Sequence, residues 1–197
     1  MAGTTFSPAN WSGYDAQTVT NPNSDLTGFT LLIDVSTFSS TWKSTVQPDA
    51  GDIRITKGSG SGGTELAYDL IDWAYNQGSP TGWIRVLWSS QLAQSGTQEV
   101  YVYVGYTPGT AVAYDAAGDP SGYGPDNAYD VNWAAYWPLF DVNDRTSNNR
   151  DLTNNGADAG ATGKVGSCHD FVLANSDHMV ATFGDIAVVI IAHHKPS

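Results

Sequence analysis

The stretch from Asp141 to Asp151 concentrates side chains of the types that bind metal ions. Carboxylate and amide oxygens are the ligands that Ca²⁺ prefers. However, the spacing matches no defined calcium loop, and Asp and Asn are also common turn formers. We therefore expect no metal and no cofactor, with calcium at this stretch as the alternative. The residues concerned are Asp141, Asn143, Asp144, Asn148, Asn149 and Asp151; the aspartates at Asp115, Asp119, Asp126 and Asp130 are spaced no better.

The acid–base and nucleophilic residues do not form a catalytic pattern. Glycosidases need two carboxylates about 5–10 Å apart, but the spacing of Asp69 and Asp72 places them on opposite faces of a regular strand. No nucleophile-elbow motif or phosphate-binding loop is present. Cys168 and His169 are adjacent, so their side chains point apart on a strand. The sequence therefore predicts no enzyme and no catalytic residue; the other histidines are His178, His193 and His194, the last two in a solvated tail.

Aromatic residues are unusually frequent, with 7 Trp and 10 Tyr. Exposed aromatic rings stack on the apolar faces of sugars, whereas buried rings fill cores. Alternation places Trp88 and Trp137 inward. Tyr101 and Tyr103 point away from the neighbouring valines, where they would cover a second sheet, line an oligomer interface or contact glycan. The remaining tryptophans are Trp11, Trp42, Trp73, Trp83 and Trp133.

The elements that would position these residues are strands. Segments of the N-terminal half alternate apolar and polar residues with a period of two, which indicates half-buried strands. The glycine-rich run 58–63 predicts a turn, and no segment has a sustained helical period. We therefore predict an all-β fold built as a sandwich or barrel. The alternating sets are Phe29, Leu31, Ile33 and Val35; Ile53 and Ile55; Leu66, Tyr68 and Leu70; Ile84, Val86 and Trp88; and Val100, Val102 and Val104.

A change of composition near residue 107 predicts a domain boundary. Residues 107–132 are rich in Pro, Gly and Asp without alternation, which is typical of a linker. We therefore predict a domain at 1–106, a linker at 107–132 and a second domain at 133–197. The strands expected in the second domain are 133–139, 169–173, 178–181 and 186–192, with a polar, turn-rich stretch at 141–155.

The charge and the N-terminus limit the partners and the compartment. The chain of 197 residues has a formal net charge of −12, which disfavours nucleic acid and anionic lipid as partners. The single cysteine allows no intrachain disulfide. Residues 1–6 lack the basic and apolar segments of a signal peptide, and no apolar run approaches membrane-span length. We expect synthesis in a cytosol, followed by release with a virus particle, unless a signal was removed.

Several pieces of the N-terminal half, in order, are similar to a known family. They are Leu32–Val35, Gly51–Ile55, Glu65–Asp69 with Asp72 and Trp73, Trp83–Val86 and Val100–Tyr106. Together they resemble a domain family of unknown function found in prokaryotic surface proteins and phage structural proteins. The resemblance covers about residues 12 to 106.

The C-terminal half resembles the opening of a concanavalin-like, laminin-G-type jelly roll. The matching pieces are Trp133–Leu139, Asp151–Thr153, Gly163–Gly166 with Asp170 and Phe171, and Ser176–Met179. A complete jelly roll of that family is much longer, so the resemblance implies an incomplete second module with 186–192 at a sheet edge. We expect that a partner subunit completes it, that it forms a smaller fold, or that the chain is truncated.

These observations predict a non-enzymatic structural or adhesive surface module. We expect a virion component, such as a head decoration, fibre or tail-tip protein, that forms a homo-oligomer or attaches to a larger particle. It would assemble through sandwich faces and edges, with cell-surface glycan as a further partner. The alternatives are a carbohydrate-binding module of a larger secreted protein and, third, a polysaccharide hydrolase.

Overall fold

The structure is a computed structural model, and it describes residues 8–59, 63–76, 78–88, 91–106, 128–129, 133–163, 167–184 and 186–190. The chain divides into two units, Met1–Ala128 and Tyr129–Ser197. Strands in the described residues pair in antiparallel sheets, and the helix α1 has 6 residues. The predicted all-β class is confirmed. No helix in these residues has the length and apolar character of a membrane span.

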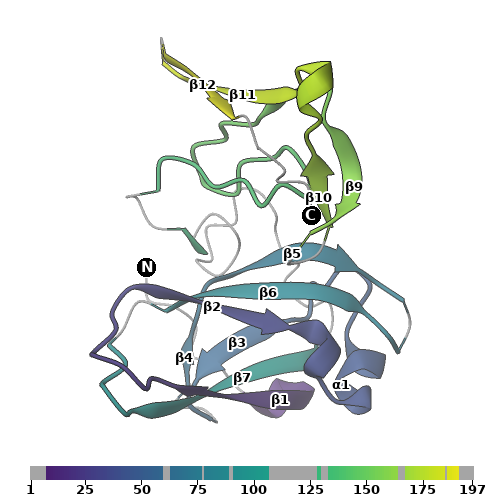
Figure 1. The fold of residues 1–197 in the computed structure, drawn as a ribbon. Helices are drawn as coiled ribbons and strands as arrows, with labels where there is room; N and C mark the ends of the chain where they lie inside the picture. Colours follow the sequence, from purple (N-terminus) through teal and green to yellow (C-terminus); the bar gives the residue numbers. More distant parts are fainter. Residues whose placement is uncertain are drawn as a thin grey trace. The chain divides into compact units, whose positions relative to one another are not determined.

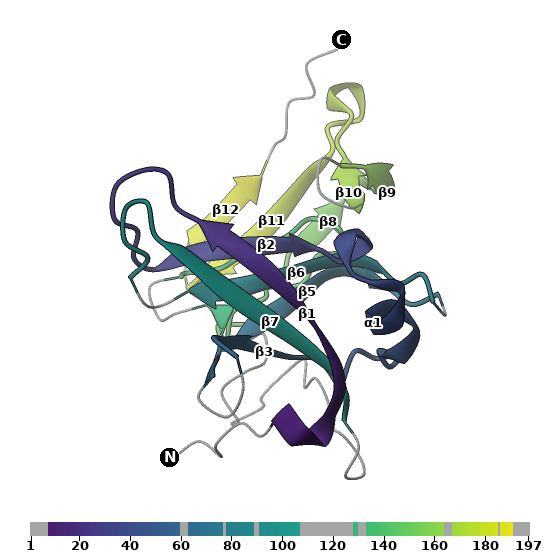
Figure 2. The ribbon, with the colours of Figure 1, turned by 90° about the horizontal axis from the view of Figure 1, so that it is seen from below.

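The first unit is a sandwich of two antiparallel sheets (Figure 1). One sheet has the order β1-β7-β3-β4 and the other has the order β2-β6-β5. Seen from below, β1 and β7 run side by side in the near layer (Figure 2). The strands are β1 (Trp11–Thr20), β2 (Phe29–Asp34), β3 (Arg54–Lys57), β4 (Thr64–Glu65), β5 (Tyr68–Ala74), β6 (Thr81–Trp88) and β7 (Thr97–Tyr106).

The core of this unit lies between the two sheets. Val100, Val102 and Val104 of β7 are fully buried, as their alternation predicted. They belong to one apolar cluster with side chains of the opposite sheet, which include Ile84, Val86 and Trp88 of β6. Each sheet thus buries the face on which its apolar residues recur with a period of two. The predicted strands of this half are confirmed as β2, β3, β5, β6 and β7.

Strand β1 is an element that the sequence pattern did not predict. Its residues alternate between half-buried and exposed along its whole length. The half-buried positions, however, include Gly13, Asp15 and Gln17, so they show no apolar alternation. The strand forms because β7 supplies backbone hydrogen-bonding partners from Tyr106 to Thr97.

Three short helical elements lie before and between the strands of this unit: η1 (Pro8–Asn10), η2 (Val35–Thr37) and α1 (Ser40–Thr45). Ser39 caps α1, because its side chain accepts a hydrogen bond from the Trp42 N–H. The Asp15 carboxylate accepts from both the backbone N–H and the hydroxyl of Ser39, at 2.8 and 2.9 Å. These bonds attach the start of α1 to β1.

Trp42 is the residue that α1 contributes to the core. It is 1% exposed, and its Nε1 donates to the carbonyl of Val102 at 3.0 Å. Its ring packs edge-on against Phe38 with centroids 4.4 Å apart. A buried indole therefore gains both apolar contact and a partner for its N–H.

A buried carboxylate joins the loop after α1 to the end of β7. Asp52 is fully buried and accepts hydrogen bonds from the backbone N–H groups of Gln47 and Gly105, at 2.9 and 2.8 Å. Burial raises the pKa of Asp52, although these hydrogen bonds lower it. Gly105 has φ of 72°, and a Cβ there would lie 1.8 Å from Oγ of Ser12. Only glycine fits this position, where β7 turns towards Tyr106.

The second unit has two small sheets, β10-β9 and β12-β11-β8. Its core contains Leu152, Phe171 and Met179, with Trp137 and Phe183 packed against it. Strand β12 lies at an edge of its sheet among the described residues. The elements are β8 (Thr153–Asn155), β9 (Asp158–Thr162), β10 (Ser167–Asp170), η4 (Leu173–Asn175), β11 (His178–Phe183) and β12 (Ile186–Ile190).

The predictions for this half were partly wrong. The predicted strands at 178–181 and 186–192 correspond to β11 and β12, and residues 191–192 lie outside the described residues. Of the predicted strand at 169–173, only 169–170 lie in β10, and 133–139 contains no strand. Pro138 has no N–H for a ladder, and Leu139 adopts a left-handed backbone with φ of 66°. The predicted linker 107–132 lies outside the described residues except for 128 and 129. The carbonyl of Ala128 accepts a hydrogen bond from Nη1 of Arg85 at 2.6 Å.

Replacing Trp42 by Ala should destabilise the first unit by about 3–5 kcal/mol, because a large cavity opens and the carbonyl of Val102 loses its donor. Urea unfolding followed by circular dichroism measures the change. Leu32→Ala is the matched control, since Leu32 is 39% exposed on β2, and its loss should cost less than about 1 kcal/mol. Equal effects of the two variants would contradict the role of Trp42 in the core.

The raised pKa of Asp52 predicts a pH dependence of stability. The contribution of a group whose folded-state pKa is raised is largest below its unfolded-state pKa, and it declines as the pH rises through the folded-state pKa. The stability difference between the native chain and Asp52→Asn should therefore favour the native chain more at about pH 3 than at about pH 7. Urea midpoints at several pH values measure this difference. A native advantage that grows with pH would contradict the prediction.

Candidate aromatic binding face

The outer surface of the β1-β7-β3-β4 sheet carries a group of aromatic side chains. Because Val100, Val102 and Val104 point into the core, Tyr101 and Tyr103 point outward. The register of β1 then places Tyr14 opposite Tyr103 and Trp11 opposite Tyr106. We call this group the aromatic face: Trp11, Tyr14, Tyr101, Tyr103 and Tyr106.

The five rings form a continuous series of contacts. Ring centroids lie 5.1 Å apart for Tyr106 and Trp11 and 6.5 Å apart for Trp11 and Tyr103. The series continues from Tyr103 to Tyr14 at 5.4 Å and from Tyr14 to Tyr101 at 5.3 Å. Tyr103 is only 3% exposed at the centre, whereas Tyr14 is 56% exposed. The face therefore has a fixed centre and an accessible rim.

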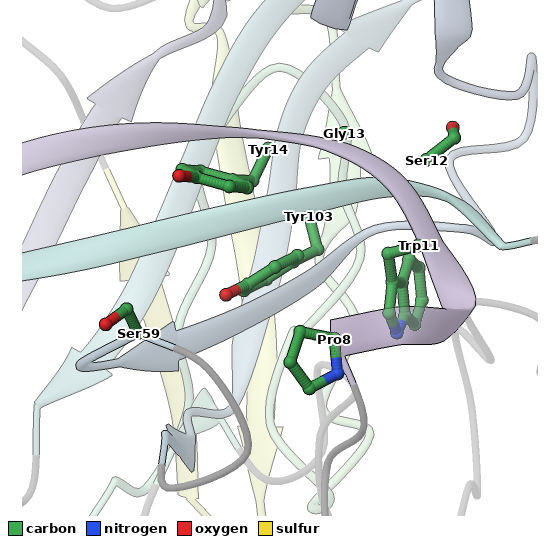
Figure 3. Close-up of a pocket in the computed structure, with 7 residues that line it drawn as sticks. All are labelled: Pro8, Trp11, Ser12, Gly13, Tyr14, Ser59 and Tyr103. Atoms are coloured by element: carbon green, nitrogen blue, oxygen red, sulfur yellow. The ribbon is translucent and has the colours of Figure 1, made fainter.

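A hollow of about 550 Å³ lies at one side of this face. Tyr14 and Tyr103 extend to the same side from neighbouring strands, and Trp11 lies next to Pro8, whereas Ser12 points away from the rings (Figure 3). The other described residues that line the hollow are Gly13 and Ser59. It is thus formed by η1, β1, β7 and the residues after β3.

The charges near the hollow are paired with other groups of the protein. The guanidinium of Arg54 lies 5.9 Å from the ring centroid of Trp11. Its Nη1 donates to the carbonyls of Gly51 and Ile53, and its Nε lies 3.9 Å from Oε1 of Glu65. The Tyr101 hydroxyl donates to Glu99, and this hydrogen bond is the main reason that the pKa of Tyr101 is raised.

The stretch 141–151, the alternative calcium site of the sequence analysis, is organised around one buried aspartate. Asp144 is 8% exposed, and its carboxylate accepts hydrogen bonds from the backbone N–H groups of Tyr136, Thr146 and Arg150 at 2.9–3.0 Å. It also accepts one from the Thr146 hydroxyl. Donors of the loop therefore occupy oxygens that a cation would need.

The other residues of this stretch have similar partners. Asp151 accepts from the N–H of Asp144, and Asp141 accepts from Asn143 and Arg145. Asn148 donates to carbonyls of Trp133 and Ala134, and Asn149 donates to Ser147. No cluster of three or more His, Cys, Asp or Glu suited to a metal ion occurs in the described residues. Asp115, Asp119, Asp126 and Asp130 lie outside them.

The candidate acid–base residues lie in structural positions. Asp69 is fully buried and pairs in register with Arg85, while Asp72 lies at a bulge of β5 with φ of 52°. The sequence prediction assumed a regular strand from Asp69 to Asp72. The strand is in fact irregular there, because the register of β5 shifts between Ile71 and Ala74. Nδ1 of buried His169 lies 2.8 Å from the carbonyl of Leu139, and a register shift separates His169 from Cys168. His178 contacts the carbonyl of Ser176, and His193 and His194 lie outside the described residues.

The tryptophans divide between cores and surface. Trp88 is 1% exposed, as its alternation predicted, and Trp137 packs against the core of the second unit. Nε1 of Trp73 donates to the carbonyl of Pro48, and Trp133 is 37% exposed. Sequence reasoning identified Tyr101 and Tyr103, named Trp11 without a position, and did not identify Tyr14. The missing signal was β1 itself, because only its pairing with β7 brings those rings onto the face.

Comparison with known proteins assigns the chain to no family. No protein-family model matches the chain, and searches of the curated proteins and of the solved structures gave no significant match. The resemblances of the two halves therefore stay predictions.

Replacing Asp144 by Ala should destabilise residues 136–151 by about 2–4 kcal/mol, because buried N–H groups lose their acceptor. Hydrogen exchange should show lost protection at the amides of Tyr136, Thr146 and Arg150. Asp141→Ala is the control, since it breaks a partly exposed ion pair worth less than about 1 kcal/mol. Unchanged protection in Asp144→Ala would contradict this role, and added protection of the native chain by Ca²⁺ would favour the calcium alternative.

Proposed function

We propose that this chain is a non-enzymatic adhesive module that binds glycan through the aromatic face of its first unit. The observation that carries the proposal is a series of five contacting rings, three of which, Trp11, Tyr14 and Tyr103, line a hollow. Rings that fill a core lie between layers, but Tyr14, Tyr101 and Tyr103 lie on the face of the sheet opposite to the core valines of β7. Tyr14, the exposed ring of the group, offers an apolar face of the kind that stacks on sugar rings, and the half-buried rings beside it extend that surface.

The remainder of the first unit serves as the support for this face. Tyr103 is held by neighbours on both sides, and β1 is joined to α1 through Asp15 and Ser39. A preorganised surface loses little conformational entropy on binding, so more of the contact free energy remains as affinity. This role is compatible with display on a virion and with a place in a larger secreted protein. Of the two, we propose that the chain is a virion component.

The net charge of −12 supports the choice of glycan over other surface ligands. Nucleic acid and anionic lipid are repelled by such a surface. Uncharged glycans are not, and their recognition depends on shape and ring stacking.

Replacing Trp11 and Tyr14 together by Ala should weaken glycan binding at least about tenfold, or by about 1.4 kcal/mol. A glycan array probed with the full chain measures the binding. Trp133→Ala is the matched control, because Trp133 is exposed but lies in the second unit.

The same variants distinguish adhesion from assembly. If the native chain binds no glycan and the double variant instead changes the oligomeric state in sedimentation, the face is a subunit interface and the proposal is wrong. Equal loss in Trp133→Ala would place the glycan site elsewhere.

A further inference from the structure

We infer that the hollow beside Trp11, Tyr14 and Tyr103 takes an uncharged saccharide of one or two rings, such as the end of a glycan chain. This inference rests on the proposed function and specifies its ligand. It follows from the lining of the hollow, from its size and from the angles between its rings.

The lining combines aromatic rings with hydroxyl groups. Trp11, Tyr14 and Tyr103 supply the rings, and Ser59 with the tyrosines supplies the hydroxyls. The described lining residues include no charged side chain. A sugar ring matches both kinds of group, since its C–H faces stack on aromatic rings and its hydroxyls exchange hydrogen bonds with hydroxyls.

An acidic sugar would find no cation prepared for it in this part of the structure. The side chain of Arg54 is 11% exposed and is directed to Glu65 and to backbone carbonyls. Lys57 lies 5.5 Å from the ring centroid of Trp88. A buried carboxylate without a matched cation is costly, so the site favours neutral units over uronic or sialic acids.

The size of the hollow suits a short ligand. Its volume of about 550 Å³ lies within the range of small-molecule sites, about 300–1,000 Å³. The planes of Tyr14 and Tyr103 are inclined by 48°, and those of Trp11 and Tyr103 by 59°. Rings inclined in this way enclose one unit from several sides, whereas a long chain lying flat requires nearly coplanar rings along its length.

Tyr101 provides an internal comparison. It lies on the same face and contacts both Tyr14 and Tyr103, but it does not line the hollow. If the ligand lies along the whole face, Tyr101 contributes as much as Tyr14. If the ligand occupies the hollow, Tyr101 contributes only indirectly, through its hydrogen bond with the side chain of Ser59.

Calorimetric titration of the full chain with neutral mono- and disaccharides, glucuronic acid and a long neutral polysaccharide tests the inference. At least one neutral mono- or disaccharide should bind with a Kd of about 1 mM, the affinity expected for a ligand of this size. Tyr14→Ala and Trp11→Ala should each weaken binding at least about tenfold. Tyr14→Phe should weaken it only a few-fold, and Tyr101→Ala should leave it within about twofold.

The outcomes separate this inference from the proposed function. Tighter binding of glucuronic acid, or binding of the polysaccharide alone with equal losses in Tyr101→Ala and Tyr14→Ala, would overturn the inference and leave glycan adhesion standing. Absence of binding to every glycan would overturn both. Circular dichroism checks folding; if Trp11→Ala misfolds, the two Tyr14 variants still decide, because Tyr14 is 56% exposed.

Discussion

Strand β7 is the element on which both the core and the candidate site depend. Its valines are fully buried between the sheets, and the alternation of the strand turns its tyrosines to the opposite surface. It also pairs with β1 on one side and β3 on the other. The core packing of the valines therefore also positions Tyr101 and Tyr103, which lie on the same strand. The binding surface is in this sense the reverse side of the core.

Aspartates of this acidic chain act repeatedly as acceptors for backbone N–H groups. Asp52 joins the loop after α1 to β7, Asp144 organises the loop at 136–151, and Asp177 accepts from Val172. A carboxylate that accepts several backbone hydrogen bonds stabilises a loop whose N–H groups have no partner in a β-sheet. Part of the acidic composition thus has a structural role, which the aspartate-rich stretch at 141–151 illustrates.

Glycine contributes where side chains would block a contact. At Gly105 the backbone is left-handed, and the space of a Cβ is occupied by Ser12 of β1. This close approach occurs where Trp11 and Tyr106 meet across the two strands. The irregularity at the end of β7 therefore helps to bring these two rings together.

The sequence by itself determined the all-β class and the inward faces of β2, β6 and β7, because a side-chain period of two is a local property of a strand. It also placed Tyr101 and Tyr103 outside the core. Only the tertiary structure decided that Trp11–Thr20 is a strand, since Gly13, Asp15 and Gln17 show no apolar alternation and the pairing partner lies far along the chain. Likewise, the apolar pattern at 133–139 predicts a strand, but none forms there, because Pro138 lacks an N–H and Leu139 has a left-handed backbone. Strand pairing and register join distant segments, so the aromatic face arises from contacts that no single segment encodes.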